Sequence, residues 1–390
     1  MALTLTLLLI SLLAVGTAIF LRALRLPGYR ILSGLLIGIL LGPTILGRIA
    51  PNQWESTFAG GMEARSALRE MDRSHAAWLL ASQTAGISES GITEEKIAHE
   101  FAREELIEIE EMIRHEHQTP WMVLTLIFAA LASVCASRTP NPQSLEGSLL
   151  RSDGISSGIW FASIPILGTL LVADLLGYSP LDPEILVVAA AVSVGPRALG
   201  HQEIKNSTQA LPGSDEWLPR AALTATLISA VLVSYAAFSG LRSAWIVVAI
   251  ILLGIPRKGW LAVHRTFRRI DLELIVVPSL AALSIIMSEV VLEWMLIPVI
   301  AICVLGGDGR WLGGVIGIRL QGGATMNQAY RVAFSLLETT IPQLAITAAA
   351  AACGAIDGIW TVALLTGIAV VELSRPARNW MENQLIPDSE

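Results

Sequence analysis

Three ionisable residues interrupt apolar stretches of the chain and are the first candidates for chemistry. Asp308 and Arg310 lie two positions apart within 292–319, and Glu338 comes one helical turn before Pro342. A charged side chain inside a membrane is costly and by default marks an ion or proton pathway. Two interpretations remain open for this set. Either Asp308 or Glu338 carries a proton, or Asp308 and Arg310 form an internal ion pair.

The segment 93–117 places histidines among glutamates, which raises the question of a metal site. Glu95 and His99 are four positions apart, as are Glu111 and His115, so each pair shares a helical face. Such pairs are ordinary on solvated helices, and the pattern favours a solvated acidic face over a metal site. The sequence holds no phosphate loop and no CxxC pair. We therefore expect no enzyme activity, catalytic residue, metal or cofactor.

The composition predicts the medium in which these residues lie. Of 390 residues, 53% are hydrophobic and 15% are charged, and the mean hydropathy is +0.62. A soluble domain has about 25% charged residues. The charges are also segregated, which leaves apolar runs of about the 17–25 residues that span a bilayer. We expect an all-α polytopic protein in the lipid bilayer, with Met1–Phe20 retained as a helix because basic residues follow it instead of preceding it.

The apolar runs predict eleven or twelve crossings. They lie near 2–21, 31–49, 120–136, 157–176, 184–199, 219–239, 243–255, 271–288, 292–319, 334–353 and 357–374. The glycine-rich stretch 304–314 interrupts the ninth, which is therefore one broken helix or two short ones. Eleven crossings collect the basic loops on one side and the acidic loops around Asp182, Glu289 and Asp357 on the other. Lysine and arginine mark the cytoplasmic side, so we prefer eleven, with the N-terminus outside and the C-terminus inside the cytoplasmic (inner) membrane.

Residues 52–118 depart from the membrane pattern, with fourteen acidic and six basic side chains. A helix is predicted over 93–117, with Thr93 as its N-cap. Its apolar stripe is expected to pack against an earlier helix around 62–82. The stripe consists of Phe101, Leu106, Ile109 and Ile113. By the predicted topology this acidic helical insertion lies outside the cytoplasmic membrane.

The predicted spans and the acidic insertion divide the chain into four parts. Transmembrane helices fill 1–51, the insertion fills 52–118, a transporter-like core fills 119–375, and 376–390 is a short cytoplasmic tail.

Glycines and prolines within the apolar spans predict close contacts and breaks. The stretch 28–51 carries four glycines, Gly34, Gly38, Gly42 and Gly47. Glycine costs about 1 kcal/mol against alanine inside a helix, but in a bilayer small residues let helix backbones approach closely.

Gly195-Pro196 interrupts the fifth span and Pro342 interrupts the tenth. Paired interruptions of this kind point to a transporter's binding site, so we expect two broken helices that cross. The alternative is that each proline only kinks a packed helix. Glu338 faces either this crossing or the cytoplasmic end of its helix.

The stretch "LPGYRILSGLLIGILLGPTILG" closely resembles the second helix of Kef-type monovalent cation:proton antiporters, of the sodium/hydrogen exchanger family. Further stretches resemble family motifs in the same order, at 187–200, 221–232, 306–320 and 342–371. The resemblance implies two inverted repeats with two broken, crossing helices, and a second domain that often mediates a homodimer. It implies exchange of sodium or potassium for protons, and no nucleic-acid partner.

The resemblance also places the family's ion site on this chain. The family's Asp-Asp pair falls on Ala225 and Thr226, so both acids are missing. Thr224 and Thr226 offer hydroxyls, which coordinate a cation but exchange no proton at physiological pH. Three further positions match a family serine, lysine and glutamate: Ser193, Arg310 and Gln343, respectively.

Two functions therefore compete. The first is solute:proton antiport with an altered or weakened ion site, in which the raised pKa of a desolvated carboxylate would allow proton and cation to compete. The second is a degenerate, non-transporting scaffold whose acidic insertion binds a partner or senses ions. The retained motifs favour the first, and the two missing acids favour the second.

Overall fold

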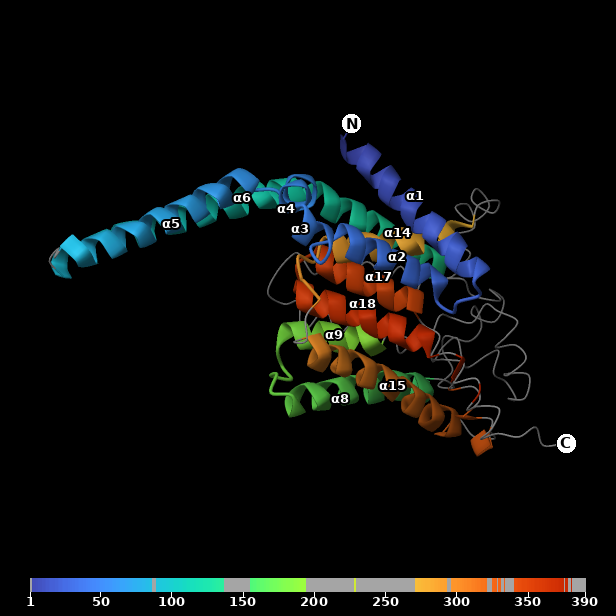
Figure 1. Cartoon of the computed structure of the whole chain (residues 1–390). Helices are drawn as coiled ribbons and strands as arrows, with labels where there is room; N and C mark the ends of the chain where they lie inside the picture. The colour runs from blue at the N-terminus through green and yellow to red at the C-terminus, as the bar shows by residue number, and fades with distance from the viewer. Residues whose placement is uncertain are drawn as a thin grey trace.

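The computed structural model describes residues 2–85, 89–136, 155–193, 228, 271–292, 296–320, 325–327, 329–330, 333, 340–374, 376–377 and 380. This part of the chain is built from helices and turns and contains no strand. Figure 1 shows a bundle of helices from which a long hairpin projects.

The helices have the following bounds. They are α1 (Ala2–Ala23), α2 (Tyr29–Leu41), α3 (Leu46–Ile49), α4 (Pro51–Trp54), the π-helical turn η1 (Glu55–Ala59), α5 (Met62–Ala85), α6 (Glu89–Ala136), α8 (Ile155–Leu175), α9 (Pro183–Ser193), α14 (Leu272–Ile286), α15 (Leu296–Leu320), α17 (Thr340–Ala352) and α18 (Gly358–Leu373).

The apolar helices fit a membrane protein. Within the described residues, three are long and apolar enough to cross a bilayer: Leu3–Ala23, Tyr29–Ile49 and Gly158–Leu175. Four shorter apolar helices lie at Pro183–Ser193, Leu272–Ile286, Ile341–Ala352 and Gly358–Leu373. Large side chains on the outside of the bundle are exposed, among them Leu5 and Leu12 of α1 and Leu171 of α8. The all-α prediction is thus confirmed for the described residues. Apart from Ile228, the predicted spans 219–239 and 243–255 lie outside them.

Helix α2 packs closely against α14, and two glycines permit this approach. A Cβ atom on Gly34 would lie 2.5 Å from the Cβ of Ala281, and closer still to the carbonyl oxygen of Pro278. A Cβ atom on Gly38 would lie 2.6 Å from the Cβ of Ile285. The close helix contact predicted from the glycines of this stretch is therefore confirmed at these two positions.

Helix α15 is continuous from Leu296 to Leu320, so the predicted interruption at 304–314 is wrong. Gly309 and Gly313 are packing positions against α8 instead of breaks. A Cβ atom on Gly313 would lie 2.6 Å from the carbonyl oxygen of Trp160, and one on Gly309 would lie 3.0 Å from the Cα of Pro165. Where two backbones approach this closely, the packing offsets the low helix propensity of glycine.

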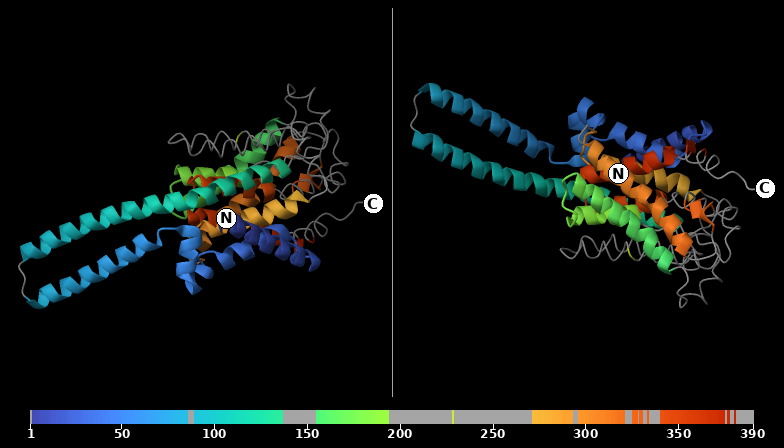
Figure 2. Two further views of the ribbon diagram at one scale, coloured as in Figure 1. Left: turned by 90° about the horizontal axis from the view of Figure 1, so that it is seen from above. Right: turned by 90° about the horizontal axis from the view of Figure 1, so that it is seen from below.

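Helices α5 and α6 form an antiparallel hairpin that extends away from the bundle (Figures 1 and 2). Helix α6 begins at Glu89 and continues through Pro120 into the bundle. The helix predicted over 93–117 is thus part of a much longer one. Thr93 lies inside that helix, so its assignment as the N-cap is wrong.

The predicted apolar stripe of α6 does not pack against α5. Phe101, Ile109 and Ile113 are exposed, by 69%, 40% and 43%, and only Leu106 is half-buried. Polar side chains contribute to the contact between the two helices. Asp72 Oδ1 lies 3.5 Å from both His99 Nε2 and Arg103 Nε. These residues mark the face of α6 that is turned toward α5, whereas Phe101 and Ile109 lie on other faces.

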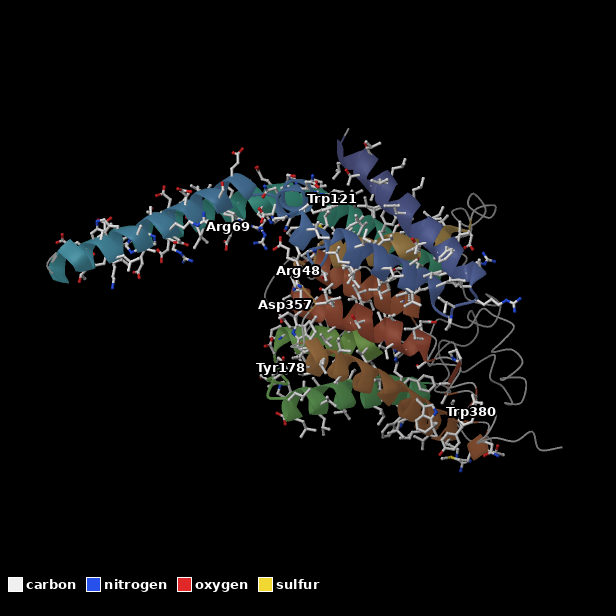
Figure 3. The ribbon with its side chains drawn as sticks, in the orientation of Figure 1. Arg48, Arg69, Trp121, Tyr178, Asp357 and Trp380 are labelled. Carbon is white, nitrogen blue, oxygen red and sulfur yellow. The ribbon has the colours of Figure 1, made fainter. Side chains whose placement is uncertain are left out.

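The acidic loops lie at the end of the bundle from which the hairpin leaves. Asp357 and Tyr178 are at this end, and Trp380 is at the opposite end (Figure 3). Trp121 packs against Phe58, with ring centroids 5.4 Å apart, where α6 enters the bundle.

Candidate functional site

A small cavity lies where four helices meet, at the end of α9, within α15, at the start of α17 and along α18. Its volume of about 10 Å³ is close to the room that one water molecule needs. Its lining residues are Ala191, Val192, Arg310, Gln343, Leu364, Gly367, Ile368 and Val371. Two of these side chains are polar, and they come from two different helices.

Gln343 joins the start of α17 to the end of α9. Its side chain is buried, and its Nε2 donates a hydrogen bond to the carbonyl oxygen of Val192 at 3.3 Å. Pro342 lies in the first turn of α17, where the missing N–H of a proline costs nothing because the first helical N–H groups have no intrahelical acceptor. Next to Val192, the buried Ser193 donates its hydroxyl to the carbonyl oxygen of Ala190 at 3.1 Å.

Arg310 brings a permanent positive charge to the same cavity. Its side chain is only 6% exposed, and an arginine stays protonated at any physiological pH. Taking such a charge out of water costs several kcal/mol. A buried ionisable residue within a set of apolar helices is by default a candidate for an ion pathway. Arg310 is therefore the strongest single candidate for a functional role in this cavity.

The structure brings together some of the residues singled out from the sequence. Arg310 and Gln343 line one cavity, and Pro342 and Ser193 lie beside Gln343 and Val192, respectively. The positions that lie outside the described residues are Gly195, Pro196, Thr224, Thr226 and Glu338. Asp308 belongs to α15, but its side chain is also outside the description. The crossing of two broken helices and the Asp308–Arg310 pair therefore stay predictions.

Helix α18 contributes lining residues that the sequence analysis missed. Leu364, Gly367, Ile368 and Val371 follow the spacing i, i+3, i+4 and i+7, so they share one helical face. This spacing is visible in the sequence. It was not informative there, because every face of this helix is apolar.

A second polar cluster fixes the base of the hairpin to the bundle. Arg65 of α5 bonds Glu110 of α6. Glu289, in the turn after α14, pairs with Arg114 and accepts a hydrogen bond from Gln118 at 2.8 Å. Burial lowers the pKa of the Arg65 guanidinium, but the hydrogen bond and charge of Glu110, with the charges of nearby carboxylates, outweigh this and raise that pKa. The base of the hairpin is thus held by ion pairs in addition to the apolar contact between Phe58 and Trp121.

The histidines of the hairpin take part in contacts between helices. The rings of His75 and His99 stack with centroids 3.8 Å apart, and His117 Nε2 lies 3.1 Å from the carbonyl oxygen of Thr57. Among the described residues, no three His, Cys, Asp or Glu side chains are placed to hold a metal ion.

No protein-family model, no curated protein and no solved structure matches this chain. A functional assignment has to be argued from the motifs of the sequence and the geometry of the cavity.

Proposed function

We propose that this chain is an integral membrane transporter of the monovalent cation:proton antiporter type, with an altered ion site at the cavity between α9, α15, α17 and α18. One observation carries the proposal. Arg310 and Gln343 are the positions that resemble the family's lysine and glutamate, and they converge on a single cavity from different helices. The Gln343–Val192 hydrogen bond also joins the two spans that the resemblance expects to be broken.

The site residues have distinct roles in this proposal. Arg310 supplies a fixed positive charge that stabilises a neighbouring carboxylate in its ionised form. Gln343 holds the start of α17 against α9. The proton carrier itself is a carboxylate, for which Asp308 and Glu338 are the candidates. The transported cation is sodium or potassium, and we place the protein in the inner membrane as a homodimer.

One observation favours a second function, that of a non-transporting scaffold of the same origin. None of the eight described residues that line the cavity carries a carboxylate. An exchange site that alternates between proton and cation needs such a group. A scaffold of this kind would act through its acidic hairpin instead of through its core.

Transport by purified protein distinguishes the two. Proteoliposomes that contain a trapped pH dye and a preset proton gradient are expected to lose the gradient when sodium or potassium is added, and not when choline is added. Asp308→Asn or Glu338→Gln is expected to stop this response at normal protein levels, because each removes a candidate carrier. A wild-type protein that responds to neither cation would contradict the antiporter and support the scaffold.

The topology yields a separate prediction. Ser66 is exposed on α5, and the hairpin is predicted outside the cytoplasmic membrane. In a cysteine-free background, Ser66→Cys is therefore expected to react with an impermeant maleimide in intact cells. Leu24→Cys is a matched control, because Leu24 is 56% exposed after α1 on the predicted cytoplasmic side. It should react only after lysis, and the reverse pattern would overturn the predicted orientation.

A further inference from the structure

The outer face of α6 carries large apolar side chains that nothing in the described part of the chain covers. Ile97, Phe101 and Met112 are 50%, 69% and 62% exposed. At 3.6 residues per turn, positions 97, 101, 108 and 112 fall on one face of the helix. The opposite face, with His99, Arg103 and Glu110, is the one that contacts α5.

The fold gives this face no partner of its own. The hairpin extends away from the bundle in every view (Figures 1 and 2). A coiled-coil hairpin would ordinarily bury its apolar positions between its two helices. Here an ion pair and stacked histidines contribute to that contact, and Ile97, Phe101 and Met112 are turned outward, whereas Leu106 and Ile107 are half-buried. Scattered single exposed side chains are normal, but three large ones on one face of a projecting helix are typical of an interaction surface.

The charge around these residues selects the chemistry of the partner. Glu94, Glu105 and Glu108 lie on the same face by their spacing, and all three are exposed. A second copy of this chain would bring glutamates against glutamates, and an anionic lipid surface would be repelled in the same way. A segment that combines apolar residues with lysine or arginine matches the face in both respects.

We propose that the outer face of α6, made of Ile97, Phe101, Glu105, Glu108 and Met112, is a docking surface for a basic amphipathic helix of a partner protein. The apolar side chains supply the contact area, and the glutamates select a cationic partner over an anionic one. This role does not depend on whether the bundle transports ions.

Peptide binding to the full chain tests this surface. The protein is placed in nanodiscs of zwitterionic phosphatidylcholine, and empty nanodiscs report peptide that binds only lipid. One fluorescent probe is a helical peptide with leucines on one face and lysines on the other. The second probe has glutamates in place of the lysines. We expect the lysine peptide to bind the protein at least about tenfold more tightly than the glutamate peptide.

Variants identify the face. Phe101→Ser with Met112→Ser should weaken binding of the lysine peptide at least about tenfold, because the burial of both apolar side chains on binding is lost. Glu105→Gln with Glu108→Gln should weaken it several-fold and reduce its salt dependence. The matched control, Glu63→Gln with Glu70→Gln, removes the same charge from exposed positions of α5. It should change the affinity by less than about twofold, because both glutamates lie on the other helix of the hairpin and make no part of the proposed face.

Three results would overturn the proposal. The first is equal affinity for the two peptides, and the second is undiminished binding by the Phe101 and Met112 double variant. The third is efficient cross-linking of Phe101→Cys between two copies, together with no peptide binding, which would assign the face to a second copy of the chain.

Discussion

Replacing Gly34 by leucine is expected to abolish accumulation of folded protein in the membrane. The first side-chain atom alone would lie 2.5 Å from the Cβ of Ala281 and would overlap the backbone of α14 at Pro278. Backbone atoms cannot rotate aside, so α2 and α14 would have to separate along their contact. Overpacking typically costs about 1–3 kcal/mol, and more when backbones shift, while a whole domain is stable by only about 5–15 kcal/mol.

The measurement is the monodisperse peak of a fluorescent fusion in size-exclusion chromatography. Gly34→Ala should give a smaller loss than the leucine variant, because it adds only one atom. Gly16→Leu is the matched control, because no atom lies within 4 Å of a Cβ at Gly16 of α1. It should leave the peak unchanged. A Gly34→Leu protein with a normal peak and a normal melting temperature would contradict the close contact between α2 and α14.

The same glycines show how far the sequence predicts this fold. The small size and helical spacing of Gly34 and Gly38 predict a close approach to another helix. Their partner is α14, which lies more than two hundred positions away and carries no matching signal. Gly309 and Gly313 were interpreted as a break, but they are contact positions against α8. A glycine that breaks a helix and one that admits a neighbour look alike until the neighbour is known.

The hairpin shows where helical periodicity misleads. The apolar spacing of Phe101, Ile109 and Ile113 correctly indicates an amphipathic helix. It does not indicate which face meets α5. That face includes Arg103 and Glu110, which pair with Asp72 and Arg65 across the hairpin. Each of these ion pairs joins residues more than thirty positions apart, so no local pattern in the sequence predicts them.

The cavity was predictable only in part. Arg310 and Gln343 were predicted as site residues from the motifs that they match, and both line the cavity. The α18 residues that line the cavity could not be singled out from the sequence, because an apolar residue in a cavity wall is of the same type as one buried elsewhere. Their contribution is shape, which depends on how four helices pack and not on the type of any one side chain.

Replacing Arg310 by leucine is expected to reduce cation-driven proton flux to the level of empty liposomes. Arg310 carries the only charge among the described residues that line the cavity. Its removal would eliminate the fixed positive field at that point. Leucine is close in size to the aliphatic part of the arginine side chain, so the substitution mainly removes the charge. Arg310→Lys should retain part of the flux, because it keeps the charge and loses the planar fork of donors.

A matched control and a second variant separate charge from folding. Arg319→Leu removes one charge from an exposed position near the end of the same helix, and its flux per folded protein should stay within about twofold of wild type. Gln343→Leu removes the donor to the Val192 carbonyl, which should lower stability by about 1–3 kcal/mol. Gln343→Glu introduces the acidic side chain of the family that the sequence resembles, at the wall that Arg310 shares. An ionised carboxylate cannot donate to the Val192 carbonyl, so less folded protein is expected, but flux per folded protein should be preserved or increased. Normal flux in Arg310→Leu proteoliposomes, at equal amounts of folded protein, would show that the ion pathway does not depend on this cavity.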